Sequence, residues 1–144
     1  MVGCNFRFYP PIQKLNQLII KKSIGKIISV QCENNSYLPD WHPSEDYTKS
    51  YAAKDSKGGG VTLTQIHELD FLTWIFGNVE NQKVHLHTHD RASGLIRLKK
   101  ANVRWFLSIN EDTLPKSIKD KGKRVFRSIR INDDELEFSD GFTE

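Results

Sequence analysis

Two halves of different character meet at the stretch GGGVTLTQIHELDFLTWIFG, residues 58–77. After its three glycines, the residues from Val61 to Phe76 are apolar around most of a helical circumference, which is typical of a buried helix. Gly77 follows the last apolar residue, where a helix commonly ends. We therefore expect a buried helix over Val61–Phe76.

Before this stretch, the hydrophobic pattern predicts one helix and one strand. Apolar residues recur at helical spacing from position 12 to position 19, directly after two prolines, and proline is favoured in a first helical turn. With Gly25 as the stop, we expect a helix from about Ile12 to Lys22. Residues Lys26 to Glu33 then alternate, which indicates a strand with one face formed by Ile28, Val30 and Cys32.

The segment from Asn34 to Lys57 is long, polar and rich in aromatic residues. A loop of this length is uncommon inside a compact domain and is usually functional. Sugar pockets use stacking rings and polar donors, although exposed aromatic residues also occur in loops without any function. Four residues of this segment are candidates for substrate binding: Trp41, His42, Tyr47 and Lys49.

After Gly77 the pattern changes to a period of two. Alternating stretches follow one another with short turns between them, as in residues 84–88, 103–109 and 124–131. Successive strands joined by short turns favour an antiparallel meander. Because the helices come first and the strands afterwards, we expect an α+β domain, with an open-faced, mostly meander antiparallel sheet and the helices packed on one face.

Length and charge limit the functions that the chain can have. The 144 residues and the formal net charge of +3 fit one domain over residues 1–144 and give no reason to expect a nucleic-acid or membrane partner. The alternation that buries Trp105 and exposes Arg104 also argues against a base-stacking sheet. We find no signal peptide and no apolar run of the roughly 20 residues that span a bilayer. Cys4 and Cys32 have no metal or redox spacing, so we expect reduced thiols in a cytoplasmic protein.

Three segments of the first half carry a family resemblance. Residues 58–77 combine Gly-Gly-Gly, a helix, His-x-x-Asp and Trp-x-Phe-Gly, while residues 3–10 and 40–51 supply two further motifs in the same order. Together they resemble the C-terminal domain of Gfo/Idh/MocA-type oxidoreductases. In the second half, residues 91–94, 103–108 and 137–143 are similar to the branch of that family that oxidises UDP-N-acetylglucosaminuronate at C3 in bacterial surface-polysaccharide synthesis.

The resemblance implies a fold and a chemistry. Members of the family join an N-terminal Rossmann domain to a second, α+β domain that binds the substrate and commonly forms the oligomer interface. They transfer hydride between a sugar carbon and the nicotinamide of NAD or NADP. A lysine of the first domain and a histidine of the second handle the proton, and His67 matches that histidine. The resemblance therefore implies a sugar or nucleotide-sugar substrate, His67 as the catalytic residue, and a homo-oligomer formed through the sheet.

The cofactor-binding part of such an enzyme has no counterpart in this sequence. No Gly-x-Gly-x-x-Gly follows a strand, so we expect the Rossmann domain to be absent and no NAD or NADP to bind to this chain alone. Many members place an aspartate one helical turn before the histidine, where this chain has Leu63 and Thr64. That departure keeps a second function open, namely a stand-alone, non-catalytic carbohydrate-binding or scaffolding domain.

Three further residues complete the predicted substrate site. Asn5 and Arg7 are two positions apart and are expected on one face of a strand. The Arg7 guanidinium suits either an anionic sugar group or an acidic side chain of the protein. Asp70 is expected to hold structure by accepting hydrogen bonds. Arg91 lies in one of the motifs of the second half and is the last candidate for substrate binding.

Among the histidines, His67 has the predicted catalytic role and His42 is a candidate for substrate binding. A general acid or base at neutral pH suits imidazole, whose unperturbed pKa is about 6.5, whereas the alternative for His67 is a histidine satisfied in the core. His85, His87 and His89 are expected on one strand face, where they match a zinc or nickel site. Alternating polar residues on an exposed face explain them more simply, and we expect no metal site.

Overall fold

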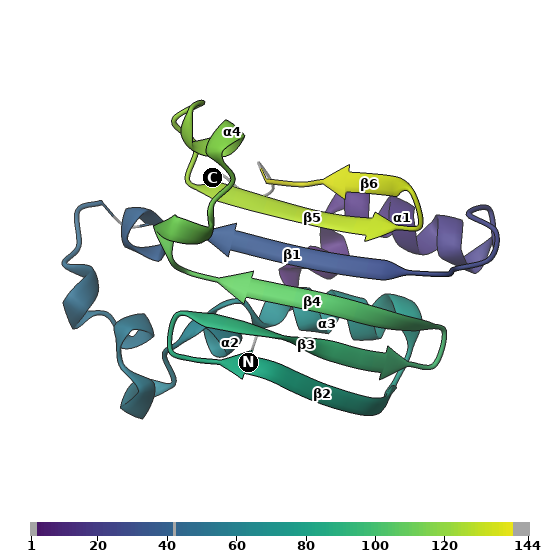
Figure 1. The fold of residues 1–144 in the computed structure, drawn as a ribbon, viewed down its shortest axis with the longest axis horizontal. Helices are drawn as coiled ribbons and strands as arrows, with labels where there is room; N and C mark the ends of the chain where they lie inside the picture. The colour runs from purple at the N-terminus through teal and green to yellow at the C-terminus, as the bar shows by residue number, and fades with distance from the viewer. Residues whose placement is uncertain (1–2, 42, 140–144) are drawn as a thin grey trace.

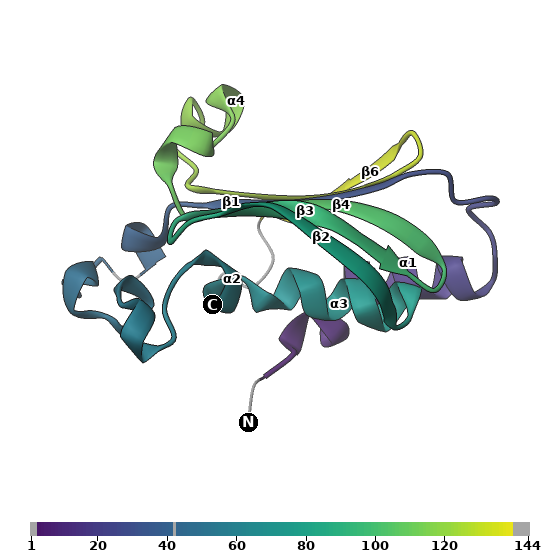
Figure 2. The ribbon, with the colours of Figure 1, turned by 60° about the horizontal axis from the view of Figure 1, so that its bottom comes forward.

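The computed structural model describes residues 3–41 and 43–139, which build a six-stranded sheet with helices on one face (Figure 1, Figure 2). The strand order is β2-β3-β4-β1-β5-β6. Neighbouring strands are antiparallel except β1 and β4, which are parallel. The predicted α+β class is confirmed. The strands are β1 (Val30–Ser36), β2 (Val79–His87), β3 (Arg91–Leu98), β4 (Ala101–Ser108), β5 (Val125–Ile131) and β6 (Asp134–Glu137).

The predicted meander is interrupted at one place. β2, β3 and β4 follow one another, and β5 pairs with β6, but β1 lies between these two groups. Cys32 of β1 pairs with Trp105 of β4 on one side and with Ile129 of β5 on the other. A strand from the first half of the chain therefore occupies the centre of the sheet. Local turn patterns do not reveal this, because the pairing joins distant segments.

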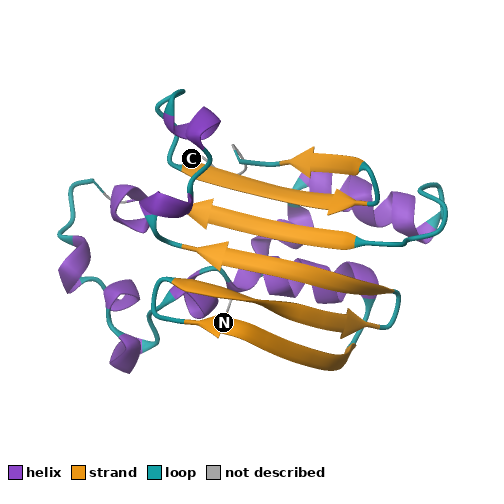
Figure 3. Cartoon of the chain, in the orientation of Figure 1, coloured by secondary structure: helices purple, strands orange, loops and turns teal. Residues whose placement is uncertain are grey.

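Two longer helices cover the sheet, α1 (Pro10–Ile20) and α3 (Ile66–Phe76) (Figure 3). Their apolar side chains meet those of the central strands, and this layer is the core, formed by Ile12, Leu15, Phe71, Leu72, Ile75, Phe76, Val103, Leu107 and Ile129. The shorter helical segments are η1 (Asn5–Phe8), η2 (Leu38–Trp41), η3 (Tyr47–Lys49), η4 (Tyr51–Ala53), η5 (Asp55–Lys57), α2 (Val61–Thr64), η6 (Glu111–Thr113) and α4 (Lys116–Lys119).

The predicted helix Val61–Phe76 is broken at Gln65 into α2 and α3. Gln65 has φ −107° and ψ 32°, outside the helical range. Its side chain is buried, and its Nε2 donates a hydrogen bond to the backbone oxygen of Ser108 at 2.8 Å. A buried amide needs such a partner, and the turn at Gln65 brings the side chain to the end of β4.

Three other predicted elements differ from the structure in their bounds or their type. The first helix begins two residues earlier than expected, at Pro10. The first strand is Val30–Ser36 rather than Lys26–Glu33, and Ile28 is 79% exposed. The backbone N–H groups of Ile28 and Ser29 donate to the Asn132 side chain instead of to a neighbouring strand. Asn5 and Arg7, expected on a strand face, lie in η1, because the chain turns there toward the helix that starts at Pro10.

Within the described residues, no helix has the length and apolar character that crossing a membrane requires. Both cysteines are free thiols, as expected, with Cys32 buried and Cys4 half-buried. Burial raises the pKa of the Cys32 thiol well above its usual value, so it stays protonated. On β4 the predicted alternation is confirmed, because Trp105 is buried beneath the helices and Arg104 is exposed on the other face.

Candidate functional site

His67 lies in the first turn of α3 and is half-buried against η1. Its ring centroid is 5.6 Å from that of Phe6, and its Nδ1 atom is buried without a hydrogen-bond partner. Burial lowers the pKa of His67, the positive charge of Arg127 lowers it further, and Asp70 opposes them. The imidazole is therefore neutral at pH 7, which is the protonation state that a proton acceptor needs.

Arg7 and Asp70 form an ion pair beside His67. Arg7 Nε lies 2.9 Å from Asp70 Oδ2, and Arg7 Nη2 lies 2.6 Å from Asp70 Oδ1, in the two-pronged geometry that favours arginine. The hydrogen bonds from Arg7 lower the pKa of Asp70, so the carboxylate stays charged. Of the two roles open to Arg7 from the sequence, the structure shows the pairing with an acidic side chain. Asn5 is exposed on the same short helix.

Beneath His67, three buried polar side chains connect α3 to the sheet. Glu68 is 1% exposed, and its Oε1 accepts a hydrogen bond from Asn34 Nδ2 at 2.7 Å and lies 3.4 Å from Arg127 Nε. Burial raises the pKa of Glu68 to about 7, against the pull of Arg127 and of its hydrogen bonds. Glu68 Oε2 has no partner. Sequence reasoning missed Glu68, Asn34 and Arg127, although a glutamate in an otherwise apolar helix was a usable signal.

A pocket of about 250 Å³ opens near this cluster. It brings together Trp41 and Tyr47, two of the predicted substrate-binding residues, and Thr64, which precedes His67 by three positions. The other lining residues are Leu38, Pro39, Glu45, Ser50, Tyr51 and Ala52. The segment expected to be a long loop thus forms a wall of short helices around an aromatic hollow.

Two other candidates from this segment do not line the pocket. His42 lies outside the described residues. Lys49 is exposed, and its Nζ lies 3.5 Å from Asp46 Oδ2. Asp46 in turn caps η3, because its Oδ1 accepts from the backbone N–H of Thr48 at 3.1 Å. The contacts of Lys49 in this structure are those of an exposed ion pair.

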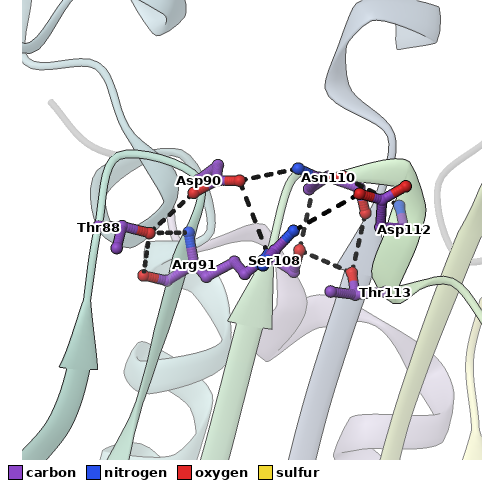
Figure 4. A network of polar contacts seen from close by, with 7 residues as sticks. All are labelled: Thr88, Asp90, Arg91, Ser108, Asn110, Asp112 and Thr113. Atoms are coloured by element: carbon purple, nitrogen blue, oxygen red, sulfur yellow. Dashed lines mark hydrogen bonds and ion pairs between the residues drawn. The ribbon is translucent and has the colours of Figure 1, made fainter.

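Arg91 belongs to a separate polar network at the end of β3, drawn in Figure 4. Arg91 Nε lies 3.7 Å from Asp90 Oδ2, and Arg91 Nη2 lies 3.8 Å from Asp112 Oδ2. Asp90 also accepts hydrogen bonds from Thr88 and Asn110, both at 2.8 Å. The network joins the β2–β3 turn to the segment after β4. Burial, and then the charge of Asp90 in this network, raise the pKa of Tyr47, which lines the pocket.

The predicted histidine row is not kept on one face. A bulge in β2 interrupts the alternation, because Val84 pairs with Gly94 and Leu86 pairs with the adjacent Ser93. His89 lies beyond the strand, where its Nδ1 is 2.7 Å from Asp55 Oδ1. Across residues 3–41 and 43–139, no group of three or more His, Cys, Asp or Glu side chains has an arrangement that could hold a metal ion.

Comparison with known proteins agrees with this architecture. Residues 12–111 match the family model of the GFO/IDH/MocA C-terminal domain. The chain belongs to the Gfo/Idh/MocA family. The crystal structure of the WlbA (WbpB) dehydrogenase from Thermus thermophilus in complex with NAD and alpha-ketoglutarate has a TM-score of 0.83 and 31% identity, covering 99% of this chain and 44% of that chain. The same dehydrogenase with NAD and UDP-GlcNAcA has a TM-score of 0.80 and 32% identity, covering 96% and 43%.

A more distant solved structure shares the fold alone. The scyllo-inositol dehydrogenase from Lactobacillus casei with bound NAD(H) and scyllo-inositol has a TM-score of 0.59 and 18% identity, covering 98% of this chain and 42% of that chain. This chain thus spans less than half the length of the family members it matches. The expected resemblance to a Gfo/Idh/MocA C-terminal domain, and to the UDP-N-acetylglucosaminuronate branch in particular, is confirmed.

Proposed function

We propose that this chain is the substrate-binding and oligomerisation domain of an NAD(P)-dependent oxidoreductase that acts on a sugar or nucleotide sugar. The observation that carries the proposal is the neutral, half-buried imidazole of His67, which the contacts of Phe6 and Arg127 connect to Trp41 in the wall of the pocket. The 32% identity to a dehydrogenase crystallised with NAD and UDP-GlcNAcA favours an acidic nucleotide sugar as the substrate.

The roles follow from the chemistry of alcohol oxidation. When hydride leaves a sugar carbon, the hydroxyl on that carbon must lose its proton, and a neutral imidazole accepts it. The lowered pKa of His67 keeps its imidazole neutral, which suits this step. Trp41 and Tyr47 would stack on the sugar, since aromatic rings offer an apolar face with a polar edge. Asn5, Arg7, His42, Lys49 and Arg91 stay candidates for binding the remainder of the substrate.

The described residues do not fit a dinucleotide. Pyrophosphate needs a glycine-rich turn with room for the ligand beside the backbone. A Cβ on Gly59 would lie 2.5 Å from the backbone oxygens of Tyr51 and Ala52, so the glycines pack against protein instead. We expect a Rossmann domain of the longer protein to bind NAD or NADP. Calorimetry of the 144-residue chain with NADH and NADPH should show no micromolar binding; such binding would contradict this division of labour.

The test of the function uses the longer enzyme that contains both domains. His67→Ala should lower turnover of UDP-sugar uronates about 10²–10⁴-fold, measured by NADH absorbance, because the proton acceptor is lost. His85→Ala, which changes an exposed histidine on β2, is the matched control and should keep full activity. Equal activity of the His67 and His85 variants would overturn the catalytic assignment.

The open face of the sheet is the proposed oligomer interface. Among the residues that the structure describes, no helix covers it except where the segment with α4 rises at one end (Figure 2). Leu86 and Leu95 lie there, 39% and 41% exposed, near the half-buried Phe106. Leu95→Lys should shift sedimentation velocity toward the monomer, because a charge would replace apolar contact. Leu63→Lys, at an exposed leucine of α2, is the control, and a monomeric unmodified chain at high concentration would refute the interface.

One observation favours a second function. Leu63 and Thr64 provide no carboxylate in the turn before His67, and Leu63 is 57% exposed. A non-catalytic carbohydrate-binding or scaffolding domain would need no such group. Two measurements distinguish the functions. A scaffolding domain binds sugar with the same affinity whether or not a nucleotide-binding domain is present. In that case His67→Ala in the longer protein leaves turnover unchanged.

A further inference from the structure

Arg127 on β5 is a nearly buried cation at the meeting point of four segments. Its side chain is 11% exposed. It lies on the helix-bearing face of the sheet, directly opposite Asn34 of β1, and Asn34 and Arg127 both contact Glu68 of α3. Its own backbone is fixed, because its N–H donates to Ser139 Oγ at 3.1 Å and its carbonyl accepts from the N–H of Phe138 at 2.9 Å.

The guanidinium also packs against two aromatic rings. The carbon Cζ of Arg127 is 5.1 Å from the ring centroid of Phe6 and 5.9 Å from that of Trp41, within the range of cation–π contact. Phe6 is the ring that contacts His67, and Trp41 lines the pocket. One side chain therefore touches both the support of the imidazole and a wall of the pocket.

We propose that Arg127 is a positioning residue that holds His67 and Trp41 in a fixed relation, so that the proton acceptor and the substrate pocket stay aligned. This inference rests on the proposed function, because only a catalytic His67 needs to stay aligned with the substrate pocket. Arginine suits the task better than lysine, because a planar guanidinium can pair with a carboxylate at its edge, here Glu68 at 3.4 Å, while its faces lie on aromatic rings. If Arg127 served only to neutralise Glu68, its contacts with the rings of Phe6 and Trp41 would have no role.

The charges around His67 give Arg127 a second, measurable effect. The charged groups that act on the imidazole are Asp70 on its own helix and Arg127 from the sheet; Arg7 and Cys4 at η1 contact Asp70, and Glu68 lies beside Arg127. Asp70 is bound to Arg7, and Glu68 is buried with a raised pKa. Arg127 is the cation that opposes protonation of His67, whereas burial acts in the same direction but does not depend on this residue.

The test is a nuclear magnetic resonance titration of the histidine rings in the 144-residue chain, with His67 assigned through His67→Ala. Arg127→Met should move the pKa of His67 upward, because the neighbouring cation is gone. Arg127→Lys should leave that pKa near its original value, because the charge is kept. Arg130→Met is the matched control, since Arg130 is on the same strand, is exposed and pairs with Glu135. It should change nothing at His67.

Hydrogen exchange of residues 38–41 is the second readout in the same variants. Both substitutions of Arg127 should speed exchange there, because neither lysine nor methionine keeps the flat contact with Trp41, while Arg130→Met should not. A folded Arg127→Met chain with unchanged His67 titration, or an Arg127→Lys chain with unchanged exchange at 38–41, overturns the proposal. If Arg127→Met does not fold, Arg127→Lys decides it alone.

These measurements are independent of catalysis, so the two proposals can fail separately. If the Arg127 variants behave as expected but His67→Ala leaves the longer enzyme active, the coupling stands and the acid/base role of His67 falls. If His67→Ala is inactive and the Arg127 variants change neither readout, the proposed function stands and Arg127 is a structural ion-pair residue only.

Discussion

The two ends of α3 show opposite chemistry within one helix. Its last two turns place Phe71, Leu72, Ile75 and Phe76 against the sheet, each at most 1% exposed. Its first turn instead carries His67 and Glu68, with a polar layer of side chains below and two buried atoms that have no partner. The apolar end stabilises the fold, while the polar end retains groups that cost stability, which is typical of a site kept for function.

The largest expected effect is at the apolar end. Phe76→Ala should lower the free energy of unfolding by about 3–5 kcal/mol, because a fully buried ring is lost and a cavity remains. Urea denaturation measures it, and the titration of His67 in the folded variant should be unchanged. Leu63→Ala, at an exposed leucine, is the control and should cost less than about 0.5 kcal/mol. A large shift in His67 titration would show that the two ends are coupled.

The second effect is at the polar end and depends on pH. The pKa of Glu68 is raised from 4.5 to about 7 in the folded chain, so folding favours the protonated form. Its contribution to stability is fully present below pH 4.5 and is lost as the pH rises to 7, by about 3 kcal/mol at 1.36 kcal/mol for each pKa unit. Glu68→Gln removes this dependence, so the variant should gain stability relative to the unmodified chain between pH 4.5 and 7.

Denaturation of both chains at several pH values checks this prediction. Glu33→Gln, which changes a half-buried carboxylate of β1, is the matched control. A difference between the Glu68→Gln chain and the unmodified chain that stays constant from pH 4.5 to 7 would mean that Glu68 titrates normally. In that case the polar end would carry no electrostatic cost, and the contrast within α3 would rest on shape alone.

The same contrast explains what could be predicted from the sequence. The apolar end of α3 was predicted because periodicity reports burial directly, and Gly77 ended the helix as expected. The break at Gln65 was missed because its cause is a hydrogen bond to Ser108, 43 residues away. The central place of β1 was missed for the same reason, since its partners lie in β4 and β5.

At the polar end, motifs identified residues but not their partners. His67 and Asp70 came from one motif and Arg7 from another, yet only the structure brings Arg7 to Asp70. Arg127 did have a local signal, because it lies two residues before Ile129 and four before Ile131, on the strand face that period two assigns to the core. Glu68 likewise shares a helix face with Phe71 and Leu72, so the pattern places both charges inside, but it does not show that they meet there.

The smallest expected effect separates the two charged groups that act on His67. Asp70→Asn should cost about 1 kcal/mol, because the Arg7–Asp70 pair is partly open to solvent and is screened there. The pKa of Asp70 is lowered in the folded chain, so the stability from this pair is present above pH 3.8 and is lost as the pH falls through the folded value. Above pH 3.8 the cost of the substitution should therefore be constant.

The titration of His67 in the Asp70→Asn chain tests whether specific charges set the pKa of His67. Asp70 raises the pKa of His67 while Arg127 lowers it, so Asp70→Asn and Arg127→Met should move that pKa in opposite directions. A general loosening of the site would expose the imidazole in both variants and raise the pKa in both, because burial is the largest cause of the shift. Opposite shifts therefore identify electrostatic control of His67 by two specific charges, and parallel upward shifts would show that packing alone sets its protonation.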